Sequence, residues 1–444
     1  MANLPTQPMA FSKDAMPGRQ NYTPALLSLG VLYFMMGFIT CLNDTLVPFF
    51  KKGFTLSYAQ SSLVQFYFFL TYGIMSIPAG KIVERVGYKK GMVMGFYMAA
   101  FGALLFLPAS ILHQYYIFLA ALFILAIGIV LLQVAANPYI TLLGPAQTAS
   151  SRLTLIQGVG SIGTTVAPLF GAHFILSRFD EASASSEAVQ YPYMGIAALL
   201  VLIAFVVSCL KLPVMAPAVS QETSQKQDSR SIFSFKNLNY GIVAIFCYVG
   251  AEVAIGTFLT NYIADILQVE EGAANSYVAF YWGGMLVGRL MGAVVLRSFK
   301  PSSVLAACAL MSILLIAVSI NTSGYMAIWS MIAVGVCNSI MFATIFSLAV
   351  AGLGKHTTRA SGLLSTAIAG GAIVSYTQGV LIDHYSWSLA FVLPLLCYVY
   401  IAFYGLWGYR SKQVSEATQE DIPIQSEPAS VGPIEQVPSL SPNK

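Results

Sequence analysis

The sequence has very little charge for its length. Only 9% of its 444 residues are Asp, Glu, Lys or Arg, whereas 57% are hydrophobic. An average soluble protein carries about 25% charged residues, which help to cover its surface. A soluble protein of this size could not cover its surface with so few charges. The composition therefore argues against a soluble enzyme and predicts a membrane protein.

Residues for metal, redox and nucleophile chemistry are also scarce. The six cysteines stand singly in apolar stretches without Cys-x-x-Cys spacing, which is typical of small buried residues. The four histidines are dispersed. A Gly-x-Gly-x-x-Gly match at Gly158, Gly160 and Gly163 lies inside an apolar stretch, so it predicts close helix packing and no dinucleotide site. We expect no cofactor, no metal, no nucleic-acid partner and no intramembrane enzyme.

Long apolar runs, in contrast, fill most of the chain. A helix needs roughly 20 residues to cross about 30 Å of hydrocarbon. Twelve runs come close to this length or exceed it: 25–50, 58–80, 91–111, 115–143, 153–177, 191–211, 238–263, 275–297, 302–320, 323–351, 360–382 and 387–408. The sequence therefore predicts an all-α membrane protein with twelve transmembrane helices.

The positions of the 22 Lys and Arg residues test this division. With a cytoplasmic N-terminus, only Lys51, Lys52 and Arg178 fall in outside loops, and Arg289 falls within a predicted span. A missed or additional helix would disturb this alternation in every later loop. The asymmetry predicts that the N- and C-termini are both cytoplasmic.

A polar stretch near the middle divides the chain into two six-helix halves. The predicted parts are a cytoplasmic N-terminal segment (1–24), an N-terminal half (25–211), a cytoplasmic linker (212–237), a C-terminal half (238–408) and a disordered cytoplasmic tail (409–444). A weak repeat relates the halves: Arg152 precedes Gly163 and Gly171, and Arg359 precedes Gly370 and Gly379. Duplicated halves of this kind are typical of secondary transporters, which bind substrate between them.

A short motif lies between the second and third predicted spans. It reads Gly80-Lys-Ile-Val-Glu84-Arg85-Val-Gly87-Tyr-Lys89-Lys90. The motif resembles the major facilitator signature Gly-x-x-x-Asp-Arg-x-Gly-x-Arg/Lys-Arg/Lys, with Glu84 in place of Asp. The resemblance implies the major facilitator fold and a role in conformational gating, in which Gly80 allows a helix contact and Glu84 with Arg85 locks helix ends. The alternative is a simple basic loop on the cytoplasmic side.

Polar residues in the first, fourth, seventh and eighth spans carry a more specific resemblance. They are Asn43-Asp44, Gln133-Val-Ala-Ala-Asn137-Pro138-Tyr139, Tyr248-Val-Gly250-Ala-Glu252 and Gly288-Arg289. Together they resemble the fucose–galactose–glucose:proton symporter family, and within it the bacterial glucose/galactose transporter branch. The resemblance implies cation-coupled hexose import, with Asp44 as the proton-coupling residue. Gln133 and Gly160 stand where the fucose permease branch carries Glu and Asn, which argues against fucose as the substrate.

Two acids lie within apolar spans, where a carboxylate is costly unless it meets water, a partner or a proton. Asp44, in the outer half of its span, suits a group that takes up a proton outside and releases it inside. The alternative is a solvated or capping Asp near the helix end. Glu252 has no basic residue within one turn on its own helix. We expect both acids to couple the ion and Glu252 also to bind sugar, unless Glu252 forms a structural pair with Arg289.

Neutral amides in apolar spans are candidates for sugar binding, because Asn and Gln both donate and accept hydrogen bonds. Gln133 and Asn137 are four residues apart and share a helix face. Trp282 is a candidate platform for the apolar face of a sugar ring. The alternatives are interhelical hydrogen bonds for the amides and a core or lipid-facing place for Trp282. The full candidate set is Asn43, Gln133, Asn137, Gln157, Glu252, Asn261, Trp282 and Asn338.

The sequence thus predicts a monomeric secondary transporter of the bacterial inner membrane. It would import a glucose- or galactose-like hexose with a proton by alternating access between its halves. Sodium is the alternative coupling ion, since carboxylates and amide oxygens serve either cation. The alternative function is the same fold carrying an amino sugar such as N-acetylglucosamine or another small solute. The expected partners are the sugar, the cation and the lipid bilayer.

Overall fold

The structure is a computed structural model that describes residues 23–53, 63–174, 189–210 and 231–410. Within these ranges, the side chains of 23–24, 43–53, 63–65, 168–169, 171–174, 271–272 and 275 lie outside the description. All regular structure in the described residues is helical. The predicted linker and tail fall largely beyond these ranges, so the domain boundaries stay predictions.

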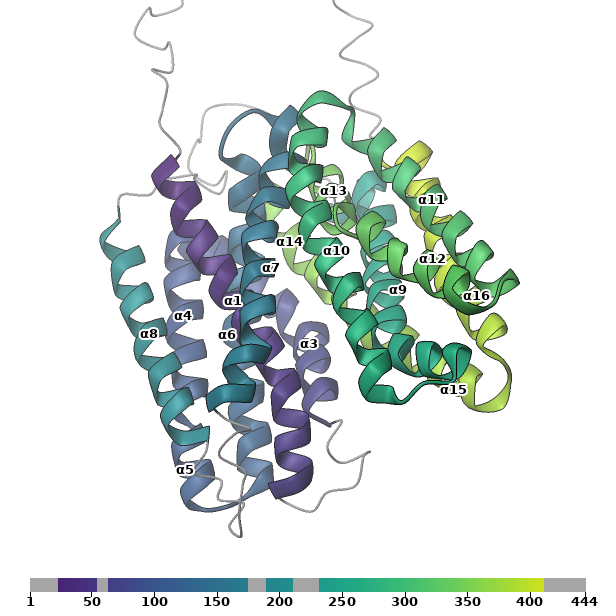
Figure 1. Cartoon of the computed structure of the whole chain (residues 1–444). Coiled ribbons are helices and arrows are strands. Elements are labelled where there is room, and N and C mark those ends of the chain that lie inside the picture. Colours follow the sequence, from purple (N-terminus) through teal and green to yellow (C-terminus); the bar gives the residue numbers. More distant parts are fainter. Residues whose placement is uncertain (1–22, 54–62, 175–188, 211–230, 411–444) are drawn as a thin grey trace, which may run out of the picture.

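The first six spans form one bundle, which we call the N-terminal bundle (Figure 1). Helix α7 packs against α1, α4 lies against both α6 and α8, and α3 packs on α6. The helices are α1 (Thr23–Gly53), α3 (Leu63–Val86), α4 (Tyr88–Leu104), α5 (Phe106–Ile111), α6 (Tyr115–Leu142), η2 (Ala146–Thr148), α7 (Ala149–Phe174) and α8 (Gln190–Cys209).

The last six spans form the C-terminal bundle (Figure 1). Helix α9 packs against α15, α16 and α13, and α11 packs against α12 and α16. The elements are η5 (Ile232–Ser234), α9 (Lys236–Leu267), α10 (Glu271–Ser298), α11 (Pro301–Asn321), α12 (Gly324–Asn338), α13 (Met341–Val350), η6 (Gly354–His356), α14 (Thr357–Thr366), η7 (Ala367–Ala369), α15 (Gly370–His384), α16 (Trp387–Phe403) and the π-helical η8 (Tyr404–Gly408).

Each of the twelve predicted spans overlaps helix among the described residues. Eleven segments of the described residues are long and apolar enough to cross a membrane, and α7 stands where the remaining span, 153–177, was predicted. Three spans contain an interruption that the sequence pattern did not predict. The third breaks between α4 and α5, the tenth between α12 and α13, and the eleventh at η7. The prediction of an all-α protein with two six-helix halves is confirmed.

The glycine-rich segment of α7 packs closely against α1, as its position inside an apolar stretch predicted. A Cβ atom on Gly37 would lie 2.2 Å from the backbone oxygen of Gly160. A Cβ atom on Gly163 would lie 2.2 Å from the backbone oxygen of Phe34. Only glycine allows two helix backbones to approach this closely. The Gly-x-Gly-x-x-Gly match is therefore a helix contact.

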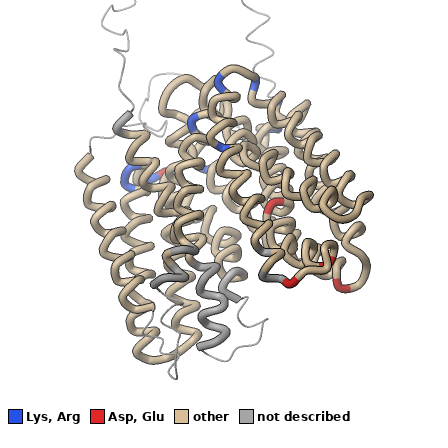
Figure 2. Tube along the Cα trace, viewed as in Figure 1, with Lys and Arg blue, Asp and Glu red and all other residues tan. Residues whose placement is uncertain are grey.

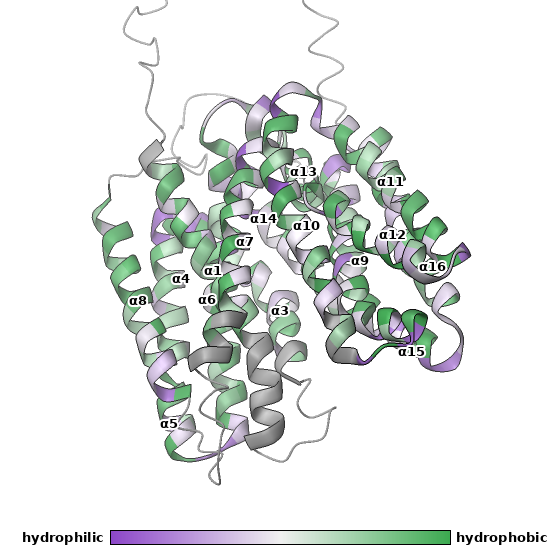
Figure 3. Ribbon diagram, in the orientation of Figure 1, coloured by the Kyte–Doolittle hydropathy of each residue, from purple (hydrophilic) through white to green (hydrophobic). Residues whose placement is uncertain are grey.

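Hydrophobic residues predominate along the helices of both bundles (Figure 3), and many of their large apolar side chains are exposed. Phe205 is 61% exposed, Met291 63% and Val294 65%. Such extended apolar surface is unfavourable in water but matches lipid tails, while the helices satisfy their backbone hydrogen bonds internally.

Lys and Arg gather at one end of the molecule, the upper end in Figure 2. We call this the basic end; it includes Lys81, Arg85, Lys89, Lys90, Arg152, Arg297, Lys300, Lys355 and Arg359. Helix α1 begins and the last helical segment ends at this same end, as an even number of spans requires (Figure 1). The bundles meet through α3 with α14 and through α7 with α10 and α13. The cytoplasmic location of the termini stays a prediction.

Candidate functional site

A cavity of about 290 Å³ lies between the two bundles. Helices α1, α3, α6 and α7 line it on one side, and α9, α10, α13 and η7 line it on the other. Part of the wall is aromatic, with Phe68, Phe69 and Phe342. The polar lining residues are Tyr33, Thr40, Tyr72, Gln133, Gln157, Thr164, Tyr248, Glu252 and Arg289. The structure therefore brings three of the predicted site residues, Gln133, Gln157 and Glu252, to one cavity.

Tyrosine hydroxyls orient the amides of α6. Tyr72 donates a hydrogen bond of 2.6 Å to Oε1 of Gln133, and Tyr33 donates to Oδ1 of Asn137. Asn137 is fully buried and does not line the cavity itself, and its Nδ2 has no hydrogen-bond partner among the described residues. The hydrogen bond from Tyr72 orients the Gln133 side chain, whose amide retains two N–H donors in this cavity-lining residue.

Gln157 is placed in the cavity by the close packing of α7. A Cβ atom on Gly158 would lie 3.1 Å from the Leu290 side chain of α10, and one on Gly160 would lie 3.1 Å from the backbone oxygen of Tyr33. Small residues on this stretch let α7 fit between α1 and α10. The Gln157 side chain is buried, and its Oε1 has no partner within the described part of the chain.

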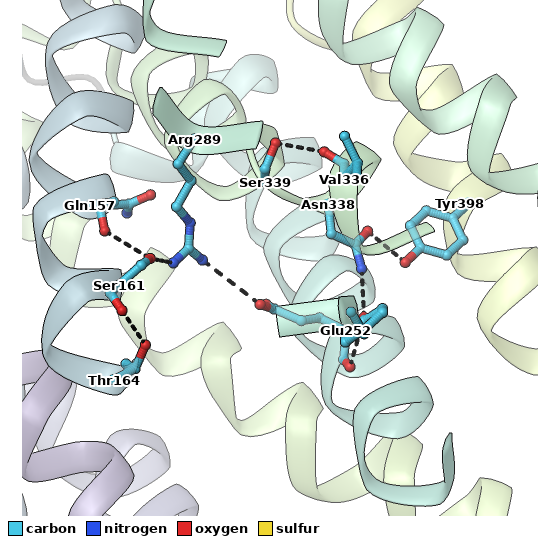
Figure 4. A network of polar contacts seen from close by, with 10 residues as sticks. Gln157, Ser161, Thr164, Glu252, Arg289, Val336, Asn338, Ser339 and Tyr398 are labelled. Atoms are coloured by element: carbon cyan, nitrogen blue, oxygen red, sulfur yellow. Dashed lines mark hydrogen bonds and ion pairs between the residues drawn. The ribbon is translucent and has the colours of Figure 1, made fainter. Parts of the chain in front are cut away.

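The opposite wall carries the charge. Nη2 of Arg289 lies 3.9 Å from Oε1 of Glu252, and the two side chains are only 18% and 14% exposed. Arg289 also donates from Nη1 to Ser161 of α7, so it links the two bundles (Figure 4). The pairing of Glu252 with Arg289 that the sequence left open is present. Both residues also line the cavity, so the pair does not remove them from the site.

Three other candidates do not reach the cavity. Asn338 is fully buried, donates to the Tyr281 hydroxyl at 2.9 Å and accepts from the Tyr398 hydroxyl at 2.6 Å, so it joins helices of the C-terminal bundle (Figure 4). Trp282 is 47% exposed and packs against Gly256. Asn261 is exposed on α9. For Asn338 the structure shows the alternative of an interhelical hydrogen bond.

Asn43 and Asp44 belong to α1 by their backbone, but their side chains lie outside the described residues. Their assignments as sugar-binding and ion-coupling residues therefore stay proposals.

The signature motif closes the basic end. Glu84 accepts a hydrogen bond of 2.7 Å from Nε of Arg359 in the other bundle, and this ion pair replaces the expected lock with Arg85. Gly80 faces Gly362, since a Cβ atom on Gly80 would lie 3.4 Å from its Cα. Gly87 has a φ of +86°, which suits glycine at the turn between α3 and α4.

The remaining basic residues of the motif stay within the N-terminal bundle or face outwards. Lys89 donates to the backbone oxygen of Ser208 at 2.7 Å, whereas the side chains of Arg85 and Lys90 are exposed.

Further hydrogen bonds cross between the bundles on the basic side of the cavity. The Tyr88 and Thr358 hydroxyls lie 2.8 Å apart, and Ser361 donates to the backbone oxygen of Val134 at 3.0 Å. Ser150 contacts Ser347, and Ser151 donates to the backbone oxygen of Ala293. Together with the Glu84–Arg359 pair, these contacts close the cavity at the basic end.

Sequence reasoning missed several residues of the site. Tyr33 and Tyr72 orient the amides of α6, but in a chain that is 13% aromatic nothing distinguishes them from lipid-facing rings. Arg289 had a clear signal, because it lies deep within a predicted span, whereas every other Lys or Arg lies in a loop, in a terminal segment or at the end of a span. A charge at that depth usually lines a water-filled path or has a partner.

Comparison with known proteins gives a consistent picture. The family model of the Major Facilitator Superfamily matches residues 29–376. A glucose/galactose transporter of Brucella abortus is 47% identical over 88% of this chain and 96% of its own length. The L-fucose-proton symporter of Escherichia coli is 33% identical over 89% of this chain and 95% of its own length.

A solved structure agrees with these relatives. The transporter FucP in its outward conformation superimposes with a TM-score of 0.80 at 31% identity, covering 88% of this chain and 100% of that chain. With its apolar surface and membrane-length helices, this chain is a multi-pass protein of the bacterial inner membrane. It belongs to the Major Facilitator Superfamily, among relatives that include glucose/galactose transporters and L-fucose-proton symporters.

Proposed function

We propose that this protein imports a neutral hexose of the glucose or galactose type together with a proton, by alternating access between its two bundles. The observation that carries the proposal is the cavity itself, which amides from one bundle and a carboxylate from the other line together. A ligand held there contacts both bundles, so its binding can influence how they move relative to each other.

The chemistry of the wall fits a sugar. Amide, hydroxyl and carboxylate groups supply hydrogen-bond donors and acceptors, and aromatic rings supply apolar faces. The volume of about 290 Å³ is at the lower limit for small-molecule sites, which favours a single sugar ring over a large drug-like compound. The names of the relatives support the same substrate class.

The positive-inside rule supports a cytoplasmic basic end. With that orientation, the Glu84–Arg359 pair and its neighbours close the cytoplasmic side of the cavity. The structure then corresponds to an outward-facing state, which agrees with its similarity to FucP in the outward conformation. Inward opening requires these contacts to break.

We propose Asp44 and Glu252 as the ion-coupling acids. Gln133 is an amide and cannot take up a proton. Glu252 is the one carboxylate among the described lining residues. Asp44 is proposed on its position in α1 and on the family resemblance. Asn43, Gln133 and Gln157 are proposed as sugar ligands, with Glu252 in both roles.

The test is uptake of labelled sugars by the full chain in proteoliposomes with an imposed proton or sodium gradient. We expect glucose or galactose to accumulate with an inward proton gradient and not with a sodium gradient alone. Accumulation of N-acetylglucosamine in place of hexoses, or dependence on sodium, would establish the alternative cargo or ion. An absence of sugar uptake under either gradient would refute the proposed function.

A further inference from the structure

Three buried polar atoms of cavity-lining residues have no hydrogen-bond partner among the described residues. They are Nε of Arg289 on α10, Oε1 of Gln157 on α7 and the hydroxyl of Tyr248 on α9. Most buried polar atoms in folded proteins are paired with protein, water or ligand. Unpartnered atoms in a cavity indicate groups that a bound molecule can hydrogen-bond.

The rest of the Arg289 side chain is held in place. Its Nη1 donates to Ser161, which in turn donates a hydrogen bond of 3.1 Å to the backbone oxygen of Gln157 (Figure 4). Its Nη2 lies 3.9 Å from the Glu252 carboxylate, which is attractive but too long for a hydrogen bond. A guanidinium has five N–H groups, so this anchoring leaves donors for a ligand.

Two of these atoms, Nε of Arg289 and Oε1 of Gln157, are complementary to a single hydroxyl group. Nε of Arg289 can only donate, and Oε1 of Gln157 can only accept, whereas a hydroxyl does both. The two residues come from opposite bundles, and Ser161 connects them. A single sugar hydroxyl between them would satisfy both atoms and bridge the bundles.

We propose that Arg289 is a specificity-determining residue, which together with Gln157 binds one hydroxyl of a neutral polyhydroxylated substrate across the bundle interface. This inference rests on the proposed function and adds to it the group that recognises the sugar. Glu252 balances the charge of Arg289, so the cavity binds a neutral substrate without attracting anions.

A direct contact has a signature that a structural role lacks. A sugar without the contacted hydroxyl should bind the parent protein roughly tenfold to a hundredfold more weakly, because hydrogen bonds to charged groups are strong. In Arg289→Met the same deoxy sugar should bind about as well as the intact sugar, because the partner of the hydroxyl is already absent. The two losses are then non-additive.

The experiment measures dissociation constants by calorimetry for the full chain in lipid nanodiscs. The ligands are the hexose that binds the parent protein best and each of its monodeoxy analogues. The variants are Arg289→Met, Arg289→Lys and Gln157→Leu, with Arg297→Met as the matched control. Arg297 is on the same helix but exposed at the basic end, so Arg297→Met should keep the parent pattern. If Arg289→Met does not fold, Gln157→Leu provides the same cycle from the other bundle.

The expected result is one deoxy position whose penalty is present in the parent protein and in Arg297→Met and absent in Arg289→Met or Gln157→Leu. If every deoxy position carried the same penalty in Arg289→Met and Gln157→Leu as in the parent protein, the proposed role of Arg289 would be overturned. The proposal of hexose transport would still stand. A parent protein that binds no hexose would instead refute the proposed function, and this inference with it.

Discussion

The two bundles pack in the same way but use their polar residues differently. Gly163 and Gly370 occupy equivalent positions of the repeat, after Arg152 and Arg359. A Cβ atom on Gly163 would lie 2.2 Å from a backbone oxygen of the neighbouring helix, and one on Gly370 would lie 2.4 Å from another. Both glycines therefore permit the same kind of close helix contact.

The two arginines of the repeat have diverged. Arg152 stays within its own bundle and donates to the backbone oxygens of Thr141 in the last turn of α6, at 2.8 Å, and of Pro145 beyond its end, at 2.9 Å. Arg359 instead crosses to Glu84 of the other bundle. The cavity walls differ in the same way, because the described N-terminal wall is neutral and the C-terminal wall carries Glu252 and Arg289. A helix contact that brings two backbones together tolerates only glycine, whereas a polar side chain such as that of Arg152 or Arg359 can bind a different partner in each bundle.

The strongest test of this comparison asks which bundle carries the coupled ion. We expect Asp44→Asn to abolish uphill accumulation of sugar while counterflow exchange continues, because Asn cannot carry a proton. Uptake and counterflow in proteoliposomes measure the two activities separately. Uphill uptake at the parent rate would remove Asp44 from the coupling mechanism and leave the C-terminal wall as its site.

Glu252→Gln tests the charged wall. We expect sugar affinity to fall roughly tenfold to a hundredfold, because a hydrogen bond to a carboxylate is stronger than one to an amide. Sugar binding to the protein in nanodiscs measures the effect. Arg297→Gln, away from the cavity, is the matched control. Unchanged affinity in Glu252→Gln would assign Glu252 a structural role as the partner of Arg289.

The shared packing predicts equal sensitivity in both bundles. We expect Gly163→Ala and Gly370→Ala each to lower the free energy of unfolding by about 3 kcal/mol, the upper part of the range for overpacking, because the new Cβ meets backbone. Gly283→Ala is the control, since nothing lies within 4 Å of its added Cβ. Thermal unfolding measures all three. A large difference between the two glycine variants would show that the bundles do not pack alike.

The smallest effects should distinguish the two arginines. Arg152→Gln should lower stability by about 1.5 kcal/mol, since it removes hydrogen bonds from a partly exposed guanidinium. Arg359→Gln should cost less than about 1 kcal/mol, because the Arg359 side chain is 56% exposed and water screens its ion pair. The effect of Arg359→Gln should appear instead as greater labelling of a cysteine placed at Val134, a buried residue whose backbone oxygen accepts a hydrogen bond from Ser361 of the other bundle. If Arg152→Gln increased that labelling equally, the distinction between the arginines would be wrong.

Much of this protein could be predicted from its sequence. The bilayer imposes a minimum length on every apolar run, and the basic loops must stay on one side, so the twelve spans follow from hydropathy and charge alone. A carboxylate in an apolar run is costly unless it meets water, a partner or a proton, and this argument singled out Glu252, which lines the cavity.

Only the tertiary structure decided which face of each helix meets the cavity. Helix α6 is apolar around its whole circumference, so its periodicity does not separate a cavity-facing side chain from a buried one. The sequence therefore predicted both Gln133 on α6 and Asn338 on α12 as sugar ligands. In the structure Gln133 lines the cavity, whereas the amide oxygen and nitrogen of Asn338 are both hydrogen-bonded to tyrosine hydroxyls. The link from Arg289 to Ser161 joins residues that are far apart in the chain, and only the packing of α7 against α10 brings them together.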